Sequence, residues 1–211
     1  KEIIVTGGAG FIGSTLVEKL LESNYAVTVI DNFDPFYNRA VKEKNIASFI
    51  HNPSCTFLEM DILQEAELEN KLTGTYVAIV HLAAKAGVRP SIENPIAYQD
   101  VNVKGTQNML EFARRRNIKQ FVFASSSSVY GINKNYPWKE GDTDLNPISP
   151  YASTKISGEL MGHVYSHLYG IRFIALRFFT VFGPRQRPDL AIHLFSKKIL
   201  NEQPIQFFGD G

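Results

Sequence analysis

Six short runs of β-branched and apolar residues alternate with segments that are long enough to form helices. Alternation of this kind builds βαβ units, whose right-handed crossovers give a parallel sheet with helices on both faces. We therefore expect a doubly wound α/β fold, in which ligands bind beyond the carboxyl ends of the strands. The expected strands lie near residues 3–5, 26–30, 56–58, 77–82, 121–124 and 173–176.

The composition of the chain excludes several classes of function. Its 22 basic and 21 acidic residues leave a net charge of +1, so no strong field attracts nucleic acid or an anionic membrane. No apolar run approaches the roughly 20 residues that span a bilayer. The one cysteine, Cys55, has no internal disulfide partner. This suits a reducing compartment, and we expect a cytoplasmic protein.

A glycine-rich stretch over residues 6–13 lies directly between the first expected strand and a helix that runs to about Glu22. Gly8, Gly10 and Gly13 fit the dinucleotide fingerprint, in which glycines let backbone amides approach a pyrophosphate at a helix N-terminus. A wider spacing, with Gly7 in place of Gly8, fits as well. The alternative interpretation is a glycine-rich turn that holds no ligand.

An acidic residue follows the second expected strand. Asp31 lies 18 residues after Gly13, where a carboxylate meets the adenosine ribose in dinucleotide-binding folds. A carboxylate there repels the 2′-phosphate of NADP, so NAD is the expected cofactor. Asp61 and Ile62, after the third strand, are placed to hold the adenine edge. The alternative for Asp31 is a solvated turn residue, because Asp is favoured in turns.

Tyr151 and Lys155 stand four residues apart in a segment of helical character, so both side chains project from one helix face. An ammonium about 4 Å from a phenol stabilises the phenolate by roughly 4 kcal/mol at an effective dielectric of about 20. That lowers the phenol pKa from about 10 to about 7, where it can act as base and acid. A second pair, Tyr130 and Lys134, falls in an expected loop. The alternative for Tyr151 is an amphipathic helix with a surface lysine.

His163 and His167 also stand four residues apart on this expected helix, a spacing that can hold zinc. No third ligand is evident in the sequence. We therefore expect both histidines to be packing or interface residues, and we expect no metal site.

Five motifs together resemble the extended short-chain dehydrogenase/reductase family of nucleotide-sugar enzymes. In order they are residues 6–13 (TGGAGFIG), 31–32 (DN), 81–84 (HLAA), 125–131 (SSSSVYG) and 151–155 (YASTK). The resemblance implies a Rossmann fold with an NAD-binding domain over residues 1–178 and the start of a smaller substrate-binding domain over residues 179–211. It also implies a truncated sequence, from which the rest of the second domain is absent.

The resemblance also implies roles for individual residues. Ser126, Tyr151 and Lys155 match the family's catalytic residues, with Ser126 bridging the substrate O4 and Tyr151. A homodimer is implied as well, in which helices near residues 96–115 and 151–168 pair across a two-fold axis. The residues implied to contact NAD are Gly7, Gly10, Phe11, Ile12, Gly13, Asp31, Asn32, Asp61, Ile62, Leu82, Ala83, Ala84, Asn102, Tyr151 and Lys155.

Within this family, the residues after the catalytic serine distinguish the reactions. They are Asp and Glu in 4,6-dehydratases, and a Glu precedes the Val in UDP-glucuronate decarboxylases. Ser127 and Ser128 stand at these positions here, so the resemblance favours 4-epimerisation through transient oxidation at C4. The alternatives are a 4,6-dehydratase, a carbonyl reductase that releases its cofactor, and a non-catalytic NAD-sensing regulator. Such regulators generally lack the Tyr-Lys pair.

Segments 85–89, 179–184 and 187–191 resemble UDP-glucuronate 4-epimerases. UDP-glucose 4-epimerases usually carry an asparagine where Thr180 stands. However, Arg185 and Gln186 replace a Trp-Gly pair that is more frequent in glucuronate enzymes, so UDP-glucose remains the alternative substrate. The residues implied to bind the sugar nucleotide, whose hydrogen-bond donors suit a C5 carboxylate, are Arg89, Ser127, Ser128, Thr180 and Arg187.

Overall fold

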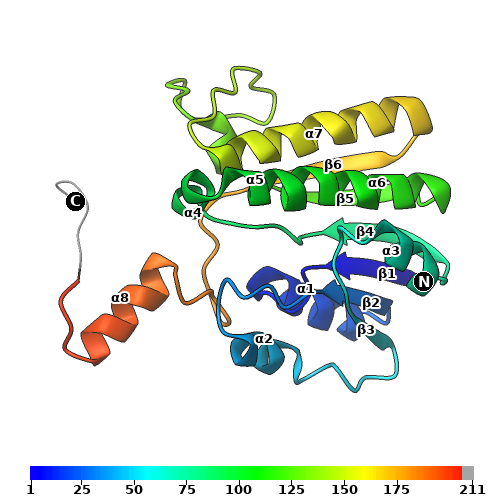
Figure 1. Cartoon of the computed structure of the whole chain (residues 1–211), viewed down its shortest axis with the longest axis horizontal. Coiled ribbons are helices and arrows are strands. Elements are labelled where there is room, and N and C mark those ends of the chain that lie inside the picture. Colours follow the sequence, from blue (N-terminus) through cyan, green and yellow to red (C-terminus); the bar gives the residue numbers. More distant parts are fainter. Residues whose placement is uncertain (206–211) are drawn as a thin grey trace.

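The computed structural model describes residues 1–205 (Figure 1). One parallel sheet of six strands runs through it in the order β3-β2-β1-β4-β5-β6. All six strands expected from the sequence are confirmed. The strand order reverses between β1 and β4, which is the switch point of a doubly wound sheet. The strands are β1 (Glu2–Thr6), β2 (Ala26–Asp31), β3 (Cys55–Glu59), β4 (Tyr76–His81), β5 (Gln120–Ser126) and β6 (Arg172–Phe178).

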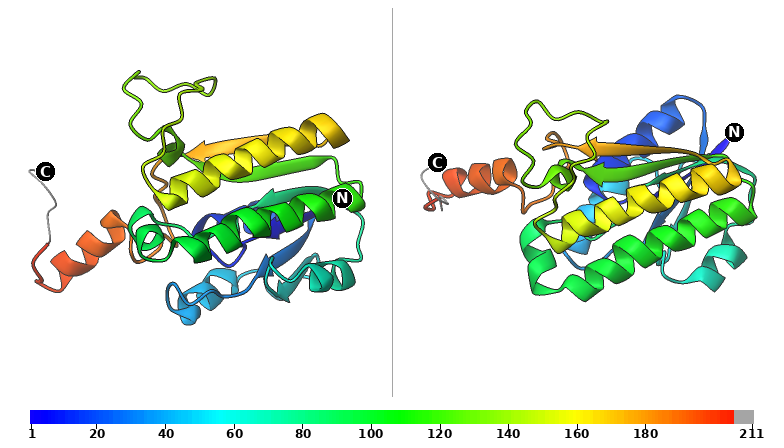
Figure 2. Two further views of the ribbon diagram at one scale, coloured as in Figure 1. Left: turned by 45° about the horizontal axis from the view of Figure 1, so that its top comes forward. Right: turned by 90° about the horizontal axis from the view of Figure 1, so that it is seen from above.

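Successive residues of each strand point to opposite faces of the sheet. Because apolar side chains project from both faces, helices cover both of them. Ile3 and Val5 of β1 pack with α1 and α2, whereas Ile4 packs with α3, α6 and α7. Figure 2 shows α6 and α7 side by side on this second face. The helices are α1 (Phe11–Glu22), α2 (Arg39–Ile46), α3 (Glu65–Lys71), α4 (Val88–Glu93), α5 (Pro95–Tyr98), the π-helix η1 (Gln99–Lys104), α6 (Gly105–Arg115), the 3₁₀-helix η2 (Ser127–Tyr130), α7 (Pro150–Tyr169) and α8 (Ala191–Leu200).

The helix expected near residues 96–115 is confirmed, and it contains a feature that the sequence did not indicate. Its middle, Gln99–Lys104, is π-helical, between α5 and α6. Single π-helical turns of this kind occur often at functional sites. This turn carries Asn102, whose side chain is buried.

Helix α7 begins and ends with strong local signals. The Ser149 side chain accepts a hydrogen bond from the Ala152 amide at 3.1 Å, and Pro150 occupies the first turn. At the other end, Gly170 adopts a left-handed conformation with φ of 64°, which glycine tolerates without strain. The start of α7 is thereby fixed one residue before Tyr151.

The connection between η2 and α7 runs over residues 131–149 and contains no helix or strand. It is held by aromatic packing. The Trp138 ring stacks on Tyr130 with centroids 4.9 Å apart, and the Trp138 indole donates to the Asn133 carbonyl at 3.0 Å. Tyr130 is a buried packing residue.

After β6 the chain passes the edge of the sheet and forms α8, which extends away from the body of the molecule (Figure 1). None of the α8 residues is buried. Strand β6 ends at residue 178, where the sequence places the domain boundary, and the assignment of a second domain stays a prediction. Residues 206–211 of that predicted domain lie outside the described residues. Within residues 1–205, no helix combines the length and apolar character that a bilayer crossing requires.

Two glycines on α7 allow this helix to lie close to the sheet. A Cβ atom on Gly158 would stand 2.3 Å from Phe123 Cζ, and one on Gly162 would stand 2.1 Å from Phe173 Cζ. Phe123 is almost completely buried, so its ring has little freedom to move away. The inner face of α7 therefore has no space for larger side chains at these positions.

We predict that Gly158→Ala lowers the free energy of unfolding by about 1–3 kcal/mol through overpacking against Phe123. This loss outweighs the gain of up to about 1 kcal/mol that alanine brings to a helix. Urea unfolding followed by circular dichroism measures the change. Gly141→Ala is the control, because nothing lies within 4 Å of a Cβ at that position. Equal unfolding midpoints for Gly158→Ala and the parent protein would contradict the close packing.

Candidate active site

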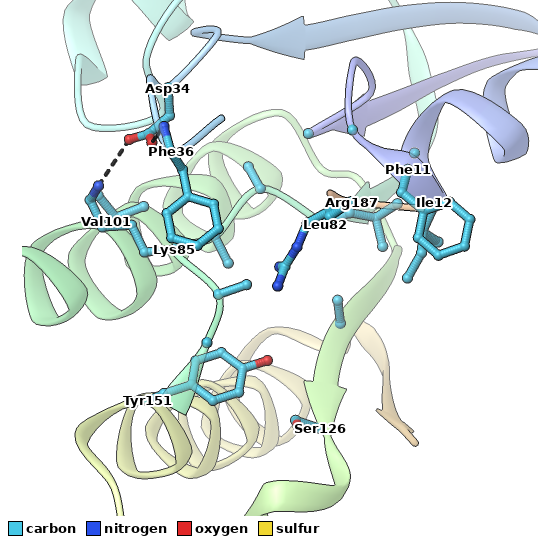
Figure 3. Close-up of a pocket in the computed structure, with 18 of the residues that line it drawn as sticks. Phe11, Ile12, Asp34, Phe36, Leu82, Lys85, Val101, Ser126, Tyr151 and Arg187 are labelled. Carbon is cyan, nitrogen blue, oxygen red and sulfur yellow. Dashed lines mark hydrogen bonds and ion pairs between the residues drawn. The ribbon is translucent and has the colours of Figure 1, made fainter. Parts of the chain in front are cut away.

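A cavity of about 760 Å³ opens at the carboxyl ends of the strands (Figure 3). Its walls come from the turns after β1, β2, β3 and β4, the end of β5 with η2, the start of α7 and the segment after β6. Most of the residues expected from the sequence line this one cavity. They are Gly7, Gly10, Phe11, Ile12, Gly13, Asp31, Asn32, Asp61, Ile62, Leu82, Ala83, Ala84, Ser126, Ser127, Ser128, Tyr151, Lys155, Thr180 and Arg187.

Two expected residues lie elsewhere. Asn102 is 1% exposed and lies behind the cavity wall. Arg89 is exposed on α4 and does not line the cavity. The remaining residues come from six separate connections, and they meet because all parallel strands end at the same edge of the sheet.

The glycine-rich turn after β1 packs against the end of β4. Gly7 has a φ of 71°, and a Cβ atom there would stand 2.8 Å from the Ala83 amide nitrogen. A Cβ on Gly13 would stand 2.2 Å from the Gly7 carbonyl oxygen. No side chain caps the N-terminus of α1 at Gly10. Helix amides at this end can therefore meet an anionic group, which the helix dipole favours.

Asp31 ends β2 and is 8% exposed. Its Oδ2 accepts from the Ala9 amide at 3.0 Å and its Oδ1 from the Phe33 amide at 2.9 Å. Burial raises the pKa of Asp31, while the charge of Lys42 and these two amides act in the opposite direction. The carboxylate is thus fixed in orientation beside the cavity. The sequence reasoning missed Lys42, whose ammonium donates to the Asp34 carbonyl at 2.8 Å.

Tyr151 projects into the cavity from the first turn of α7, near Ser126 at the end of β5 (Figure 3). Burial raises the Tyr151 pKa above its ordinary value, whereas a hydrogen bond with Ser126 and the charge of Arg187 lower it. The expectation that Lys155 brings this pKa down to about 7 is therefore wrong for the protein by itself. Desolvation of the phenol is the larger effect here.

Lys155 is 4% exposed and faces aromatic rings. Its ammonium lies 5.1 Å from the Phe123 ring centroid and 5.8 Å from that of Tyr151. Burial lowers the Lys155 pKa to about 8. The Lys155 ammonium is therefore partly deprotonated near pH 8, which weakens it as a source of positive charge beside the phenol.

Asn102 joins the loop after β4 to helix α7. Its Oδ1 accepts from the Lys85 amide at 2.8 Å, and its Nδ2 donates to the Lys85 carbonyl at 3.0 Å. The same Nδ2 donates to Thr154 Oγ1 at 3.1 Å, and Thr154 donates to the Tyr151 carbonyl at 2.7 Å. The Asn102 side chain therefore holds protein groups in place behind the cavity.

His81, at the end of β4, lies in a buried polar cluster. The Thr106 hydroxyl donates to the Asn102 carbonyl at 2.6 Å, so it accepts at 3.1 Å from His81 Nε2. His81 Nδ1 then accepts from the Thr6 hydroxyl at 2.8 Å. This network assigns a neutral imidazole that carries its proton on Nε2. Burial and the charge of Lys155 lower the His81 pKa to about 3.

The same Thr6 oxygen also serves the cavity wall. It accepts hydrogen bonds from the Leu82 amide at 3.2 Å and the Ala83 amide at 3.1 Å. Thr6, His81 and the start of the following loop therefore form one rigid unit beside Gly7.

Sequence reasoning missed two further groups of the site. Lys85 and Asp34 form an ion pair of 2.9 Å between the loops after β4 and β2 (Figure 3). No local pattern joins residues 51 positions apart. Tyr98 packs edge-on to Tyr151 at 6.4 Å and donates to the Ala86 carbonyl at 2.8 Å. Its position four residues before Asn102 places both on one helix face, and this was a usable signal.

Other expectations concern the outer surface of α7. His163 and His167 are both exposed there, and no three metal-ligating side chains gather anywhere within residues 1–205. Leu160, Val164 and Leu168 recur at helical spacing and are 47–62% exposed. They form an apolar stripe on one of the two helices expected at a dimer interface.

Comparison with known proteins gives consistent matches over the whole chain. Residues 3–211 match the family described as the NAD dependent epimerase/dehydratase family. An uncharacterised protein of Methanocaldococcus jannaschii is 48% identical over 100% of this chain and 66% of its own length. The chain spans about two thirds of the length of the curated relatives it matches.

Two solved structures show the same fold with different sugars. A variant of UDP-glucuronic acid 4-epimerase from Bacillus cereus, in complex with UDP-4-deoxy-4-fluoro-glucuronic acid and NAD, has a TM-score of 0.93 at 41% identity. The UDP-glucose 4-epimerase of Thermotoga maritima, with UDP-glucose, has a TM-score of 0.88 at 34% identity. Each match covers 100% of this chain and 67% of the other. The predicted Rossmann fold is confirmed by these matches.

The buried His81 gives a prediction for stability against pH. The unfolded chain binds a proton at the ordinary pKa of 6.5, and the folded chain does so only at about 3. Stability is therefore lost as pH falls from 6.5 through 3, by about 2 kcal/mol between pH 7 and pH 5. We expect the His81→Asn variant, which keeps an acceptor for Thr6, to lack this loss of stability between pH 7 and pH 5. Urea unfolding of both proteins at the two pH values measures it, and an identical pH dependence would refute the assignment.

Proposed function

The chain belongs to the NAD-dependent epimerase/dehydratase family, and we propose that it is the cofactor-binding part of a nucleotide-sugar 4-epimerase that acts on UDP-glucuronate. One observation carries the proposal. Ser126, Tyr151 and Lys155 meet at one cavity, and the residues that follow Ser126 on its wall are serines with no ionisable group. The proposal concerns the complete protein that contains this chain, together with its sugar-binding part.

The cavity fits an NAD molecule. The glycine turn has no room for a Cβ at Gly7, the start of α1 is uncapped, and Asp31 stands at the end of β2. In the proposal the helix amides hold the pyrophosphate and Asp31 accepts from the adenosine ribose. Leu82 and Ala83 also line the cavity. When bound, NAD supplies hydride acceptance and return at the sugar C4.

The chain's own residues move the proton. Tyr151 takes the proton of the C4 hydroxyl as the C4 hydride leaves, which gives a 4-keto sugar. The sugar then presents its other face, and Tyr151 returns the proton to O4 as hydride is added back. Ser126 holds both Tyr151 and O4 by hydrogen bonds. Lys155 faces the Tyr151 ring from the same helix, and its ammonium would balance the negative charge that develops on Tyr151 during the proton transfer.

Hydroxyls in place of carboxylates favour epimerisation over elimination. A dehydratase needs an acid and a base near C5 and C6, and Ser127 and Ser128 can serve as neither at neutral pH. The Tyr-Lys pair also argues against a non-catalytic regulator, which has no use for it. A simple carbonyl reductase would release its cofactor at each turnover, whereas an epimerase keeps it.

The sugar is proposed from the hydrogen-bond donors of the cavity. Ser127, Ser128 and Thr180 line it, and no carboxylate stands beside them on β5 or η2. Donors of this kind suit a C5 carboxylate. They also hold it in a defined orientation, which matters because a 4-keto glucuronate is a β-keto acid prone to lose CO₂. Arg187 lines the same cavity and pairs with Asp189 at 2.9 Å.

A second copy of the protein is the partner that we propose for α7. Leu160, Val164 and Leu168 form an apolar stripe on its outer face, and the α6 helix lies beside it. Pairing of this face with its symmetry mate would cover the stripe and leave the cavity open.

The assignment of Tyr151 has a direct test within the chain. We expect Tyr151→Phe to abolish turnover in the complete protein and to leave NAD affinity within about threefold. The reason is that the Tyr151 hydroxyl acts in the transition state and is not needed to bind NAD. Tyr130→Phe is the control. The Tyr130 hydroxyl donates to the Lys139 carbonyl at 3.1 Å in the adjacent connection, and this variant keeps most activity. Comparable losses in the two variants would remove Tyr151 from its role.

The sugar preference is tested by comparing kcat/KM for two substrates. We expect the complete protein to convert UDP-glucuronate to UDP-galacturonate at least about tenfold more efficiently than it converts UDP-glucose, since one lost buried donor costs about 1–3 kcal/mol. Thr180→Asn should narrow the gap. A preference for UDP-glucose would overturn the carboxylate argument and leave the 4-epimerase assignment standing.

A further inference from the structure

A partly buried ion pair lies behind the candidate active site and takes no part in the proposed chemistry. Glu159 of α7 and Arg177 of β6 are only 14% and 15% exposed, the lowest values of any ion pair that the structure describes. Arg177 Nη2 donates to Glu159 Oε2 at 2.8 Å and Nε donates to Oε1 at 3.0 Å. Withdrawing two charges from water to this extent is costly unless their polar atoms find partners.

A third donor completes the hydrogen bonds to the Glu159 carboxylate. Ser125 of β5 donates its hydroxyl to Glu159 Oε1. Ser125 and Arg177 stand opposite each other in the register of β5 and β6, so their side chains leave the sheet on the same face, beneath α7. Glu159 therefore ties one helix to two neighbouring strands.

The Arg177 guanidinium also reaches the connection 131–149. It lies 4.9 Å from the Tyr130 ring centroid, and its Nη1 donates to the Glu140 carbonyl at 3.4 Å. The Tyr130 ring also stacks on Trp138. A connection without helix or strand is thereby held at its middle by one side chain of β6.

Each partner of Glu159 adjoins a residue of the proposed site. Ser125 precedes Ser126, Arg177 precedes Thr180 by three residues, and Glu159 follows Lys155 by one helical turn. We propose that Glu159 and Arg177 are positioning residues, which fix the catalytic serine, the Tyr-Lys helix and the Thr180 segment relative to one another. Neither residue lines the cavity, so they act through these neighbours.

Misplacement is expected to affect the rate more than binding. The proposed proton transfer needs Ser126 and Tyr151 at hydrogen-bonding distance from the same oxygen, and a shift of about 1 Å can cost about 100-fold in rate. The glycine turn and Asp31, which carry the proposed NAD contacts, lie on the far side of β1 from β6. Glu159 bonds to β5 and β6 instead, so the proposed pyrophosphate and adenosine ribose contacts of NAD lie outside the part of the site that the pair fixes.

The inference rests on the proposed function, and its test separates the two. In the complete, NAD-loaded protein, Glu159→Ala should lower kcat for UDP-glucuronate epimerisation by about 10- to 100-fold and change KM and the NAD Kd by less than about threefold. Glu159→Gln keeps the Oε1 acceptor and two of its three bonds, and kcat should recover to within about fivefold of the parent value. Glu69→Ala is the matched control, because Glu69 pairs with Arg115 at 2.7 Å far from the cavity.

A second measurement needs no activity. Hydrogen exchange of the amides in residues 127–149 should be faster in Glu159→Ala than in the parent protein, and unchanged in Glu69→Ala. Unchanged kcat, or unchanged exchange in this segment, would overturn the inference. If the parent protein epimerises no UDP-sugar, the proposed function fails and the exchange result alone decides whether Glu159 anchors the connection. If Glu159→Ala does not fold, Ser125→Ala, which removes one donor only, takes its place with the same expected directions.

Discussion

The candidate site depends on a close backbone contact between the ends of β1 and β4. Gly7 lies directly against the Leu82–Ala83 peptide, and no side chain fits between them. Behind this contact, the Thr6 hydroxyl accepts from the amides of Leu82 and Ala83 and donates to His81. The Leu82 and Ala83 amides thus find their hydrogen-bond partner inside the protein. The opposite side of the contact faces the cavity, and the other cavity walls surround it.

The environment of Lys155 shows how the site can keep a charged group inside the protein without pairing it with a carboxylate. Its ammonium faces the rings of Phe123 and Tyr151, and the carboxylate of the same helix, Glu159, is engaged by Arg177 and Ser125. Aromatic faces stabilise a cation more weakly than a carboxylate does. The Lys155 charge is therefore still available to a phenolate or to a bound anion. Because no carboxylate compensates for its burial, the pKa of Lys155 falls to about 8.

Local patterns in the sequence predicted most of the fold. The six strands, the capped start of α7 at Ser149 and the gathering of residues such as Asp31, Ser126 and Tyr151 at one edge all follow from local patterns and from the geometry of parallel sheets. What the sequence could not indicate depends on distance and burial. The Lys85 pair with Asp34 joins residues 51 positions apart. The Tyr151 pKa depends on desolvation, which outweighs the neighbouring charge. Arg89 was assigned to the sugar site only because segment 85–89 matched a motif. That motif does not indicate that Arg89 is exposed on α4.

Helix α7 has two faces with opposite tolerance to change. The inner face, with Gly158 and Gly162 against Phe123 and Phe173, has no room for substitution. The outer face carries Leu160, Val164 and Leu168, which are about half exposed, so packing within the chain constrains their residue types less. Substitutions on the outer face would therefore disturb the packing of the domain less than substitutions on the inner face. A change in how copies of the chain associate through the outer face would leave the packing that places Tyr151 and Lys155 intact.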